Sequence, residues 1–517
     1  MKSEETLIEL PVIGAVNRRR LFYWACCAVL LCSYLWIAWR VPYTHDDWDW
    51  GLPIGLERWL TGELNSRYAG TLFVLVMTRV PLVKTLVMGI CIFLVPHLAV
   101  SLVCTEPDRR LTMELMAHGL MLSIPIMTWR QTYGWVSAFA NYVVGAAWML
   151  LILTLLKKTF SGHRKWAVLL FPMSLIGQLF VENLSVLMVF LTAVAAGYAV
   201  KNRRGRAGAL AALAGALIGL ALMFFNPLYS DLVSTGSAIA GIRKLVFPVG
   251  AGIGEIVSSV AKRGFRLVLP GLIDSHPVLW GAVILACLIR GAQRKLPWFL
   301  LAPAGIFSAA YLSITLYTIW QQLEGGPRYP ETWLRTIGSA ALVVLIVAAL
   351  WTDREVRWPG LFLLASTLIL VVPFAAIYEY GPRCCYPSMV CLLLLVLLLA
   401  RDIPFLLWHK IGIGLACLGV LVFHLYVYGV IGRCEALRAS LLQEAVEQGA
   451  QSVIMPLEST STYYMHCLLP VSEERADYFR QFYGLPEDLQ LIFLPRGSYD
   501  TWPEIDQDML DHAFIYN

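Results

Sequence analysis

The sequence predicts an all-α, polytopic membrane protein with interfacial helices on its outer face and a small C-terminal α/β domain. Of the 517 residues, 58% are hydrophobic and only 15% are charged, a balance that soluble domains do not have. The hydrophobic residues gather into about thirteen runs close to the length that spans a bilayer as a helix. The net charge of +5 is small, and its basic residues fall in short clusters between these runs. We therefore expect no nucleic-acid partner.

The predicted spans follow one another along most of the chain. They cover residues 21–39, 82–104, 111–128, 135–156, 166–181, 184–200, 207–225, 272–290, 297–319, 333–351, 359–378, 386–400 and 405–431. Basic clusters occupy every second connection, at 18–20, 109–110, 157–165, 201–206, 290–295, 354–357 and Arg401. By the positive-inside rule these connections are cytoplasmic, as is the N-terminus. An odd number of spans places the C-terminal domain on the outer side of the cell membrane.

The chain divides into a membrane domain, residues 1–431, and an extracytoplasmic domain, residues 432–517. Two outer loops of the membrane domain, 40–81 and 226–271, carry apolar residues at helical spacing in stretches too short to span. Basic residues accompany the apolar ones in the second loop, as in helices that lie along lipid headgroups. The C-terminal domain shows a helical pattern at 436–448 and strand-like runs at 452–456 and 489–494.

An acidic cluster, His45-Asp46-Asp47-Trp48-Asp49-Trp50, begins the first outer loop. Three carboxylates so close together allow one to act as a general base while a neighbour orients it or helps to hold a divalent cation such as Mg or Mn. The alternative is a solvated loop with a helix N-cap at Asp46 or Asp47. The flanking tryptophans favour the functional interpretation. Asp47-Trp48-Asp49 also imitates a metal-binding DxD pattern of nucleotide-sugar enzymes, but its outer location argues against that use.

Other outer connections contribute polar candidates. Glu182-Asn183 interrupts an apolar stretch, where a carboxylate is costly unless it faces a polar cavity or a partner; a turn at headgroup level is the alternative. Arg130 and Arg383 lie just beyond helix ends and are candidate phosphate ligands, with membrane anchoring as the alternative. Arg67 is a further phosphate candidate, with a helix start as its alternative, and Arg328 is a substrate-binding candidate. His97 and His118, within apolar runs, are expected to be packing residues.

The C-terminal domain and the cysteines give weaker signals. Tyr463, Tyr464 and His466 are candidates to meet an acceptor sugar, with an ordinary surface as the alternative. Most of the twelve cysteines lie within apolar runs, where a thiol behaves as a small hydrophobe. No Cys-x-x-Cys pair or Cys/His spacing predicts a zinc site.

The arrangement of an acidic pair in the first outer loop, interfacial helices, many spans and a small outer C-terminal domain resembles the GT-C superfamily of integral-membrane glycosyltransferases. Asp46-Asp47 occupies the place of the family's first-loop acidic motif. Four segments look like the sparse motifs of an uncharacterised bacterial branch of polytopic GT-C-like proteins: 46–51, 65–70, Trp135 with Asn141-Tyr142, and Glu182-Asn183.

The resemblance implies transfer of a sugar from a polyprenyl-phosphate donor to a glycan or lipid acceptor of the cell envelope. Asp46 or Asp47 is then the base and Glu182 a supporting contact to the acceptor. The remaining substrate-binding candidates are Asp49, Arg67, Arg130, Asn183, Arg328 and Arg383. If a metal takes part, its ligands are expected among Asp46, Asp47 and Asp49.

Two other classes of function remain open. A transporter or flippase of a lipid-linked glycan would carry charged groups near the middle of the membrane and often paired halves with broken helices. Here the charges gather at the outer ends of the spans and no halves repeat. A non-catalytic envelope assembly protein would use its outer domain to bind a partner.

Overall fold

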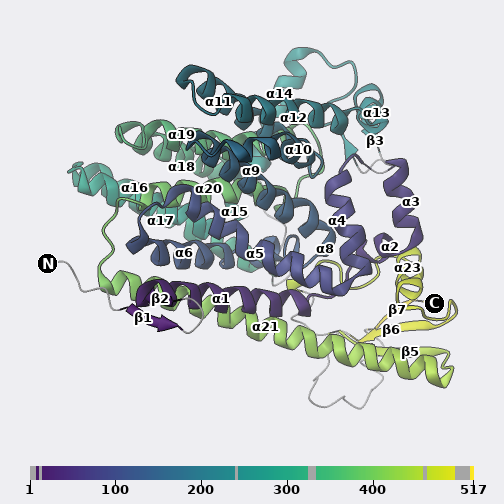
Figure 1. The fold of residues 1–517 in the computed structure, drawn as a ribbon. Helices are drawn as coiled ribbons and strands as arrows, with labels where there is room; N and C mark the ends of the chain where they lie inside the picture. The colour runs from purple at the N-terminus through teal and green to yellow at the C-terminus, as the bar shows by residue number, and fades with distance from the viewer. Residues whose placement is uncertain are drawn as a thin grey trace.

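The structure is a computed structural model that describes residues 7–10, 14–63, 65–238, 243–323, 333–457, 463–494 and 513–516. Helices dominate these residues, and most run roughly parallel through one bundle (Figure 1). Ten of the described helices are long and apolar enough to cross a membrane. This agrees with the predicted all-α polytopic membrane protein.

These ten helices account for most of the predicted spans. They are α1 (Arg18–Arg40), α5 (Pro81–Val103), α8, η1 and α9 (together Val136–Phe160), α11 (Glu182–Asn202), α12 (Arg206–Phe224), α17 (Trp298–Leu323), α18 (Trp333–Thr352), α19 (Arg357–Ile369) with η4 (Val372–Ala375), η5 and α20 (together Pro382–Ala400), and α21 (Leu407–Gln448).

The other three predicted runs also form helices. Residues 272–290 form α16 (Pro277–Gln293), which meets the preceding helix, Ile253–Asp274, at an angle of 86°; the two together make an eleventh candidate span. Residues 111–128 and 166–181 give shorter helices, α6 (Pro107–Leu122) and α10 (Ala167–Gly177). By length and composition the described residues therefore provide ten or eleven spans, against about thirteen predicted from the runs.

The loop at residues 40–81, predicted to be outer, folds into three short helices at one end of the bundle: α2 (Asp47–Gly51), α3 (Pro53–Thr61) and α4 (Tyr68–Arg79). Proline at the first position favours the start of α3, and Gly62, with φ of 66°, ends it in the left-handed conformation. Arg79 donates hydrogen bonds to the carbonyls of Trp50 and Leu52. The predicted short helices of this loop are thus present.

The C-terminal segment lies beside this loop at the same end of the bundle, away from the start of α1 (Figure 1). Its strand β5 (Ser452–Pro456) runs parallel to β6 (Gln490–Leu494), which pairs antiparallel with β7 (Phe514–Tyr516). The two predicted strands are therefore confirmed. The boundary predicted after residue 431 falls inside α21, which continues unbroken from the bundle to Gln448.

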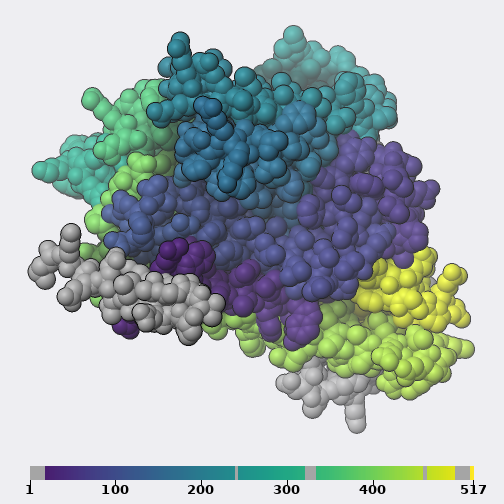
Figure 2. Space-filling view, viewed as in Figure 1, coloured from purple at the N-terminus to yellow at the C-terminus, as the bar shows by residue number. Residues whose placement is uncertain are grey.

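The loop and the C-terminal segment share one hydrophobic core. Trp48 is 1% exposed and packs among residues of α21, α23 (Glu473–Tyr483) and the small sheet. Its ring meets that of Phe479 edge-on, with the centroids 5.2 Å apart. The space-filling view shows the yellow C-terminal residues directly against the purple loop (Figure 2). The loop that carries the acidic cluster is therefore held in place by the end of the chain.

The second outer loop is helical in part. It contains α13 (Pro227–Thr235), β3 (Ser237–Ala238), β4 (Arg243–Lys244), α14 (Ile253–Arg263), η3 (Gly264–Val268) and α15 (Leu269–Asp274). No residue of α14 is buried, although Ile253 and Val257 are apolar. The predicted amphipathic helix is present, and its exposed apolar side chains suit a lipid surface.

Candidate functional site

Asp46 stands between two aromatic side chains. The indole N–H of Trp135 donates to its Oδ1 at 2.7 Å, and Nδ1 of His45 lies 3.8 Å from the same oxygen. Its Oδ2 accepts no hydrogen bond from the described residues, and a quarter of the side chain is exposed. Burial raises the pKa of Asp46, but the His45 ring and the Trp135 hydrogen bond outweigh it, so that the pKa is lowered. This carboxylate is ionised, with one oxygen free.

Both oxygens of Asp47, in contrast, accept hydrogen bonds from neighbouring residues. Its oxygens accept from the N–H of Thr44 at 3.0 Å and from the N–H and hydroxyl of Ser137 at 2.8 and 2.6 Å. The side chain is completely buried. Burial and the neighbouring charge of Asp46 raise the pKa of Asp47 to about 7. These contacts fix α2 to α8 (Val136–Ala138), so Asp47 positions its neighbour.

Asp49 is neutralised by two arginines. Arg58 of α3 and Arg475 of α23 each place a guanidinium nitrogen 2.6 Å from a different oxygen of this carboxylate. The residue is 2% exposed. It therefore ties the acidic loop to the C-terminal segment. Because Asp47 and Asp49 have no free oxygen to share with Asp46, the geometry does not favour a cation held by the three aspartates.

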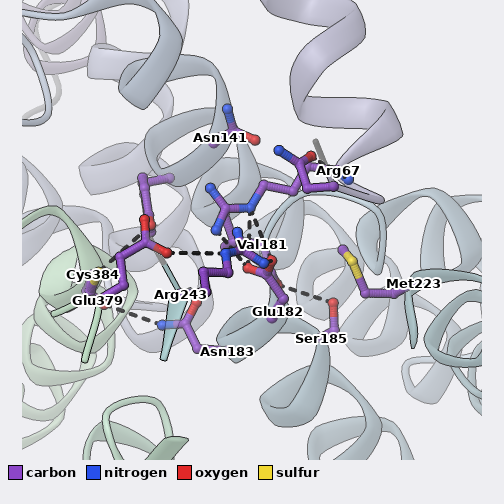
Figure 3. Close-up of polar contacts among 12 residues, drawn as sticks. Arg67, Asn141, Val181, Glu182, Asn183, Ser185, Met223, Arg243, Glu379 and Cys384 are labelled. Atoms are coloured by element: carbon purple, nitrogen blue, oxygen red, sulfur yellow. Dashed lines mark hydrogen bonds and ion pairs between the residues drawn. The ribbon is translucent and has the colours of Figure 1, made fainter. Parts of the chain in front are cut away.

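Glu182 is the centre of a buried ionic network (Figure 3). Arg67, just before α4, directs Nε and Nη2 to its Oε2 at 3.1 and 2.8 Å. Nη1 of Arg243 and the hydroxyl of Tyr229 reach Oε1 at 3.1 and 2.8 Å. Nε of Arg243 also lies 3.1 Å from Glu379. The network thus joins both outer loops to the start of α11.

Arg383 extends this network to the acidic loop. Its guanidinium makes two long contacts, each of 3.4 Å, to Glu379 and to the side chain of Gln131. It also lies over the Trp135 ring, 5.5 Å from the centroid. The same indole therefore contacts Asp46 at its edge and Arg383 on its face. Long contacts leave the guanidinium able to bind an anion.

Arg130 is the second weakly engaged arginine. Its Nε is buried and has no hydrogen-bond partner, and no ion pair to it is present among the described residues. It ends α7 (Ile126–Arg130), next to the fully buried Trp129. An unsatisfied buried guanidinium nitrogen is costly unless a ligand satisfies it. Arg130 and Arg383 are therefore the phosphate candidates that the geometry favours.

The remaining predicted residues, unlike Arg130 and Arg383, are not free to bind a ligand or are not described. The side-chain amide of Asn183 donates to the carbonyls of Leu370 and Cys384 at 3.1 and 3.2 Å, and the residue is 2% exposed. These bonds fasten α11 to neighbouring segments, a structural role. Arg67 pairs with Glu182 and is likewise committed to the protein. Arg328 lies outside the described residues.

A close approach of α4 to η1 (Phe139–Val143), a turn of π-helix, brings two of the predicted motifs together. A Cβ on Gly70 would lie 2.2 Å from Oδ1 of Asn141, so only glycine fits there. With the Asp46–Trp135 and Arg67–Glu182 contacts, this packing places all four sequence motifs in one region of the molecule.

The C-terminal segment adds a residue whose place the sequence did not predict. The ring of His466 stacks on Trp135, with the centroids 4.2 Å apart, and its backbone N–H donates to Gly134 at 3.3 Å. Burial and the charges of His45, Arg130 and Arg383 lower the pKa of His466 to about 3. A neutral imidazole therefore covers one face of the site.

Three further residues of the site, Arg243, Glu379 and Arg475, carried no functional prediction. They lie in connections or in a polar helix, where isolated charges are ordinary. Only the folded chain brings them to Glu182 and Asp49, and no local spacing signals this.

No protein-family model, curated protein or solved structure matches this chain.

Proposed function

We propose that the protein is a membrane glycosyltransferase that moves a sugar from a polyprenyl-phosphate donor to a glycan or lipid acceptor of the cell envelope. One observation carries the proposal most directly. A carboxylate with a free oxygen, Asp46, and a guanidinium with only long contacts, Arg383, meet the same indole of Trp135. Transfer from a phosphate-linked sugar needs these two groups close together, one as base and one as anion ligand.

The proposed reaction uses Asp46 as the general base. Its carboxylate takes the proton of an acceptor hydroxyl while that oxygen attacks the anomeric carbon of the donor sugar. The bond from this carbon to the phosphate oxygen breaks, and its electron pair leaves with the lipid phosphate. Arg383 and Arg130 stabilise the charge that develops on the phosphate. Asp47, Trp135 and Glu182 are positioning residues in this scheme.

The proposed topology puts this site on the outer face. The acidic loop and the C-terminal segment lie at the end of the bundle opposite the start of α1, where the basic cluster 18–20 is located (Figure 1). By the positive-inside rule that basic end faces the cytoplasm. A donor carried by a membrane lipid then reaches the site without cytosolic nucleotides.

The test uses purified protein in lipid nanodiscs, polyprenyl-phosphate hexoses and pentoses with isotope-labelled sugars, and envelope glycans and lipids as acceptors. Mass spectrometry should detect a labelled covalent product. Asp46→Asn keeps the shape of the side chain but removes the base, and its rate should fall about 10²- to 10⁴-fold. The matched control is Asp231→Asn, at an exposed position of α13, which should leave the rate unchanged.

Two results would reject the proposal. The absence of labelled product with every donor would oppose the transferase itself. A fully active Asp46→Asn variant would instead remove Asp46 as base.

A transporter of a lipid-linked glycan is the second candidate, and one buried cluster favours it. Glu114 of α6 is 1% exposed, accepts a hydrogen bond from Tyr23 at 2.9 Å, and lies 3.0 Å from Nδ1 of His97. Ionisable residues buried in a helix bundle often mark a proton path. A transporter should move a fluorescent lipid-linked glycan across proteoliposome membranes without a new glycosidic bond, and Glu114→Gln should stop it. Movement that Glu114→Gln leaves unchanged would oppose this candidate.

A further inference from the structure

Three side chains with metal-binding atoms meet beside Asp46. They are His45 of the first outer loop and His466 and Cys467 of the C-terminal segment, and their donor atoms all lie within 4.8 Å of one another. Nε2 of His466 is 3.6 Å from Sγ of Cys467, and the two imidazole centroids are 5.3 Å apart. No local spacing signals this cluster, because His45 lies more than 400 residues before His466 and Cys467.

The two imidazoles carry unsatisfied polar atoms. Nδ1 of His45 and Nδ1 of His466 are both buried without a hydrogen-bond partner. Buried nitrogens of this kind are rare in folded proteins, because each loses the hydrogen bonds that water would provide. A cation at the cluster would remove that cost at Nδ1 of His45, whereas His466 faces Cys467 with Nε2 and would bind through that nitrogen.

The backbone at the cluster is also unusual. His45 and Cys467 adopt φ values of 54° and 43°, in the left-handed region. Residues other than glycine seldom occupy this region, and those that do concentrate at functional sites. His45 and Cys467 thus share an uncommon backbone conformation at the place where the donor atoms meet.

We propose that His45, His466 and Cys467 bind one divalent cation of the zinc class, which links the first outer loop to the C-terminal segment. Two imidazoles and a thiolate are the ligands of zinc, whereas Mg²⁺ and Mn²⁺ prefer oxygen. Zinc bonds of about 2.0 Å to nitrogen and about 2.3 Å to sulfur, at a tetrahedral angle, separate the two ligand atoms by about 3.5 Å. The observed 3.6 Å between His466 and Cys467 agrees with this value.

The cluster has charged neighbours of both signs. Arg383 lies over the Trp135 ring, on which His466 stacks, and opposes a positive ion. The Cys467 thiolate and the Asp46 carboxylate, whose Oδ1 is 3.8 Å from His45, together offset the two charges of the metal. Three protein ligands leave a fourth position for water. This cation site is an inference separate from the proposed sugar transfer. Binding of the cation can be measured without an assay of transfer.

The experiment uses full-length, tag-free protein stripped of metal with a chelator and titrated with Zn²⁺ against a chromophoric competitor. We expect one tightly bound Zn²⁺ per chain. Cys467→Ser and His45→Ala should each weaken it at least about 100-fold, since even lesser changes around a metal cost 10- to 100-fold. The matched controls are Cys32→Ser and His163→Ala, both exposed and elsewhere in the chain, which should bind Zn²⁺ as the natural sequence does.

Cobalt provides a spectroscopic readout of the ligands. Co²⁺ in the site should give a sulfur-to-metal charge-transfer band that Cys467→Ser abolishes and Cys32→Ser keeps. Monodispersity and metal-free thermal unfolding confirm that each variant is folded; if Cys467→Ser is not, the Co²⁺ band of the natural protein and its loss when the Cys467 thiol is alkylated decide the question. Absence of stoichiometric Zn²⁺, or binding that survives loss of Cys467 and His45, would overturn the proposal.

Discussion

Arg67 and Glu182 lie 115 residues apart in the chain and form a two-pronged ion pair, in which Nε and Nη2 of the arginine approach the same carboxylate oxygen at 3.1 and 2.8 Å. Arg67 precedes α4 of the first outer loop, and Glu182 begins α11 of the bundle. The pair therefore fastens the loop that carries the acidic cluster to the membrane helices.

Breaking this pair should destabilise the protein. The two side chains are only 16% and 21% exposed, so that a partner left alone is poorly hydrated. We expect Arg67→Ala to lower the free energy of unfolding by about 3 kcal/mol. Glu182→Ala should cost more, because it also leaves Arg243 and Tyr229 without their shared acceptor. The double variant should lose less than the sum of the two.

Denaturant unfolding measures these differences. The matched control is Asp108→Asn, which removes the negative charge of the Arg19–Asp108 pair, where the side chains are 74% and 81% exposed. Exposed pairs contribute little, so this variant should unfold like the natural protein. Strict additivity of the Arg67 and Glu182 effects would show that the two side chains do not act as a pair.

Arg383 and Arg130 should determine the affinity for the phosphate of the donor. Replacing either with glutamine removes a guanidinium that makes few contacts within the protein, so folding should change little. We expect kcat/KM for the lipid-phosphate donor to fall about 10- to 100-fold per residue, the effect of losing about 1.4 to 2.8 kcal/mol of charge stabilisation. Arg383→Lys should recover part of this, because lysine keeps the charge but not the planar fork.

Initial rates at varied donor concentration provide the measurement. Arg354→Gln, at an exposed position between α18 and α19, is the control and should leave kcat/KM as it is. An equal loss in the control and in the Arg383 variant would refute specific phosphate binding.

The raised pKa of Asp47 should give stability a recognisable pH dependence. The pKa of Asp47 is about 7 in the folded protein, against a reference value of 3.8. The folded state therefore holds the proton more strongly than the unfolded state does. The contribution of Asp47 is then fully present below about pH 4 and is lost as the pH rises through about 7. Asp47→Asn cannot titrate, so this component should disappear.

The measurement is the difference in Tm between the natural protein and Asp47→Asn, taken at intervals from pH 4.5 to 8. Other groups, such as His466, titrate in both proteins and cancel in the difference. The natural protein should lose stability relative to the variant as the pH rises to about 7, and a constant difference would contradict the pKa shift. Asp46 has a lowered pKa and does not titrate in this range.

Gly70→Ala should disturb the site through packing alone. The added Cβ would lie 2.2 Å from Oδ1 of Asn141 and 3.3 Å from its Cα, so the Asn141 side chain must shift and α4 and η1 must separate slightly. Overpacking of this kind typically costs about 1–3 kcal/mol. Gly197→Ala is the matched control, because nothing lies within 4 Å of its Cβ in the middle of α11. That variant should be neutral or slightly stabilised, and similar unfolding of the two variants would argue against the close approach.

The sequence predicts the helices well because a spanning helix can be recognised from its local composition, a continuous apolar run. Every predicted run forms a helix, and the short helices of the first loop lie close to where their apolar spacing puts them. The predicted number of spans is less secure, since α6 and α10 are apolar but short. The length of a helix in the folded chain depends on where proline and polar residues end it. The length of an apolar run in the sequence is only an approximate guide to this.

The site was predicted only in part. Asp46, Glu182 and Arg383 were identified because charges at the edge of an apolar run are conspicuous. The sequence does not predict the separate roles of Asp46 and Asp47. These roles depend on the hydrogen bonds that Trp135 donates to Asp46 and Ser137 donates to Asp47. Contacts between the first loop and the C-terminal segment have no signature in spacing, because they join residues hundreds of positions apart.

The position of Trp48 has a consequence for how the protein is made. Its packing partners in α23 and β6 are among the last parts of the chain to leave the ribosome, whereas α1 and the acidic loop are inserted first. A nascent chain can therefore complete its membrane insertion while Asp49 still lacks Arg475 and Trp48 has no partner. The contacts around the acidic loop are complete only after translation has passed β6, so that chains truncated before that strand can reach the membrane with the candidate site unassembled.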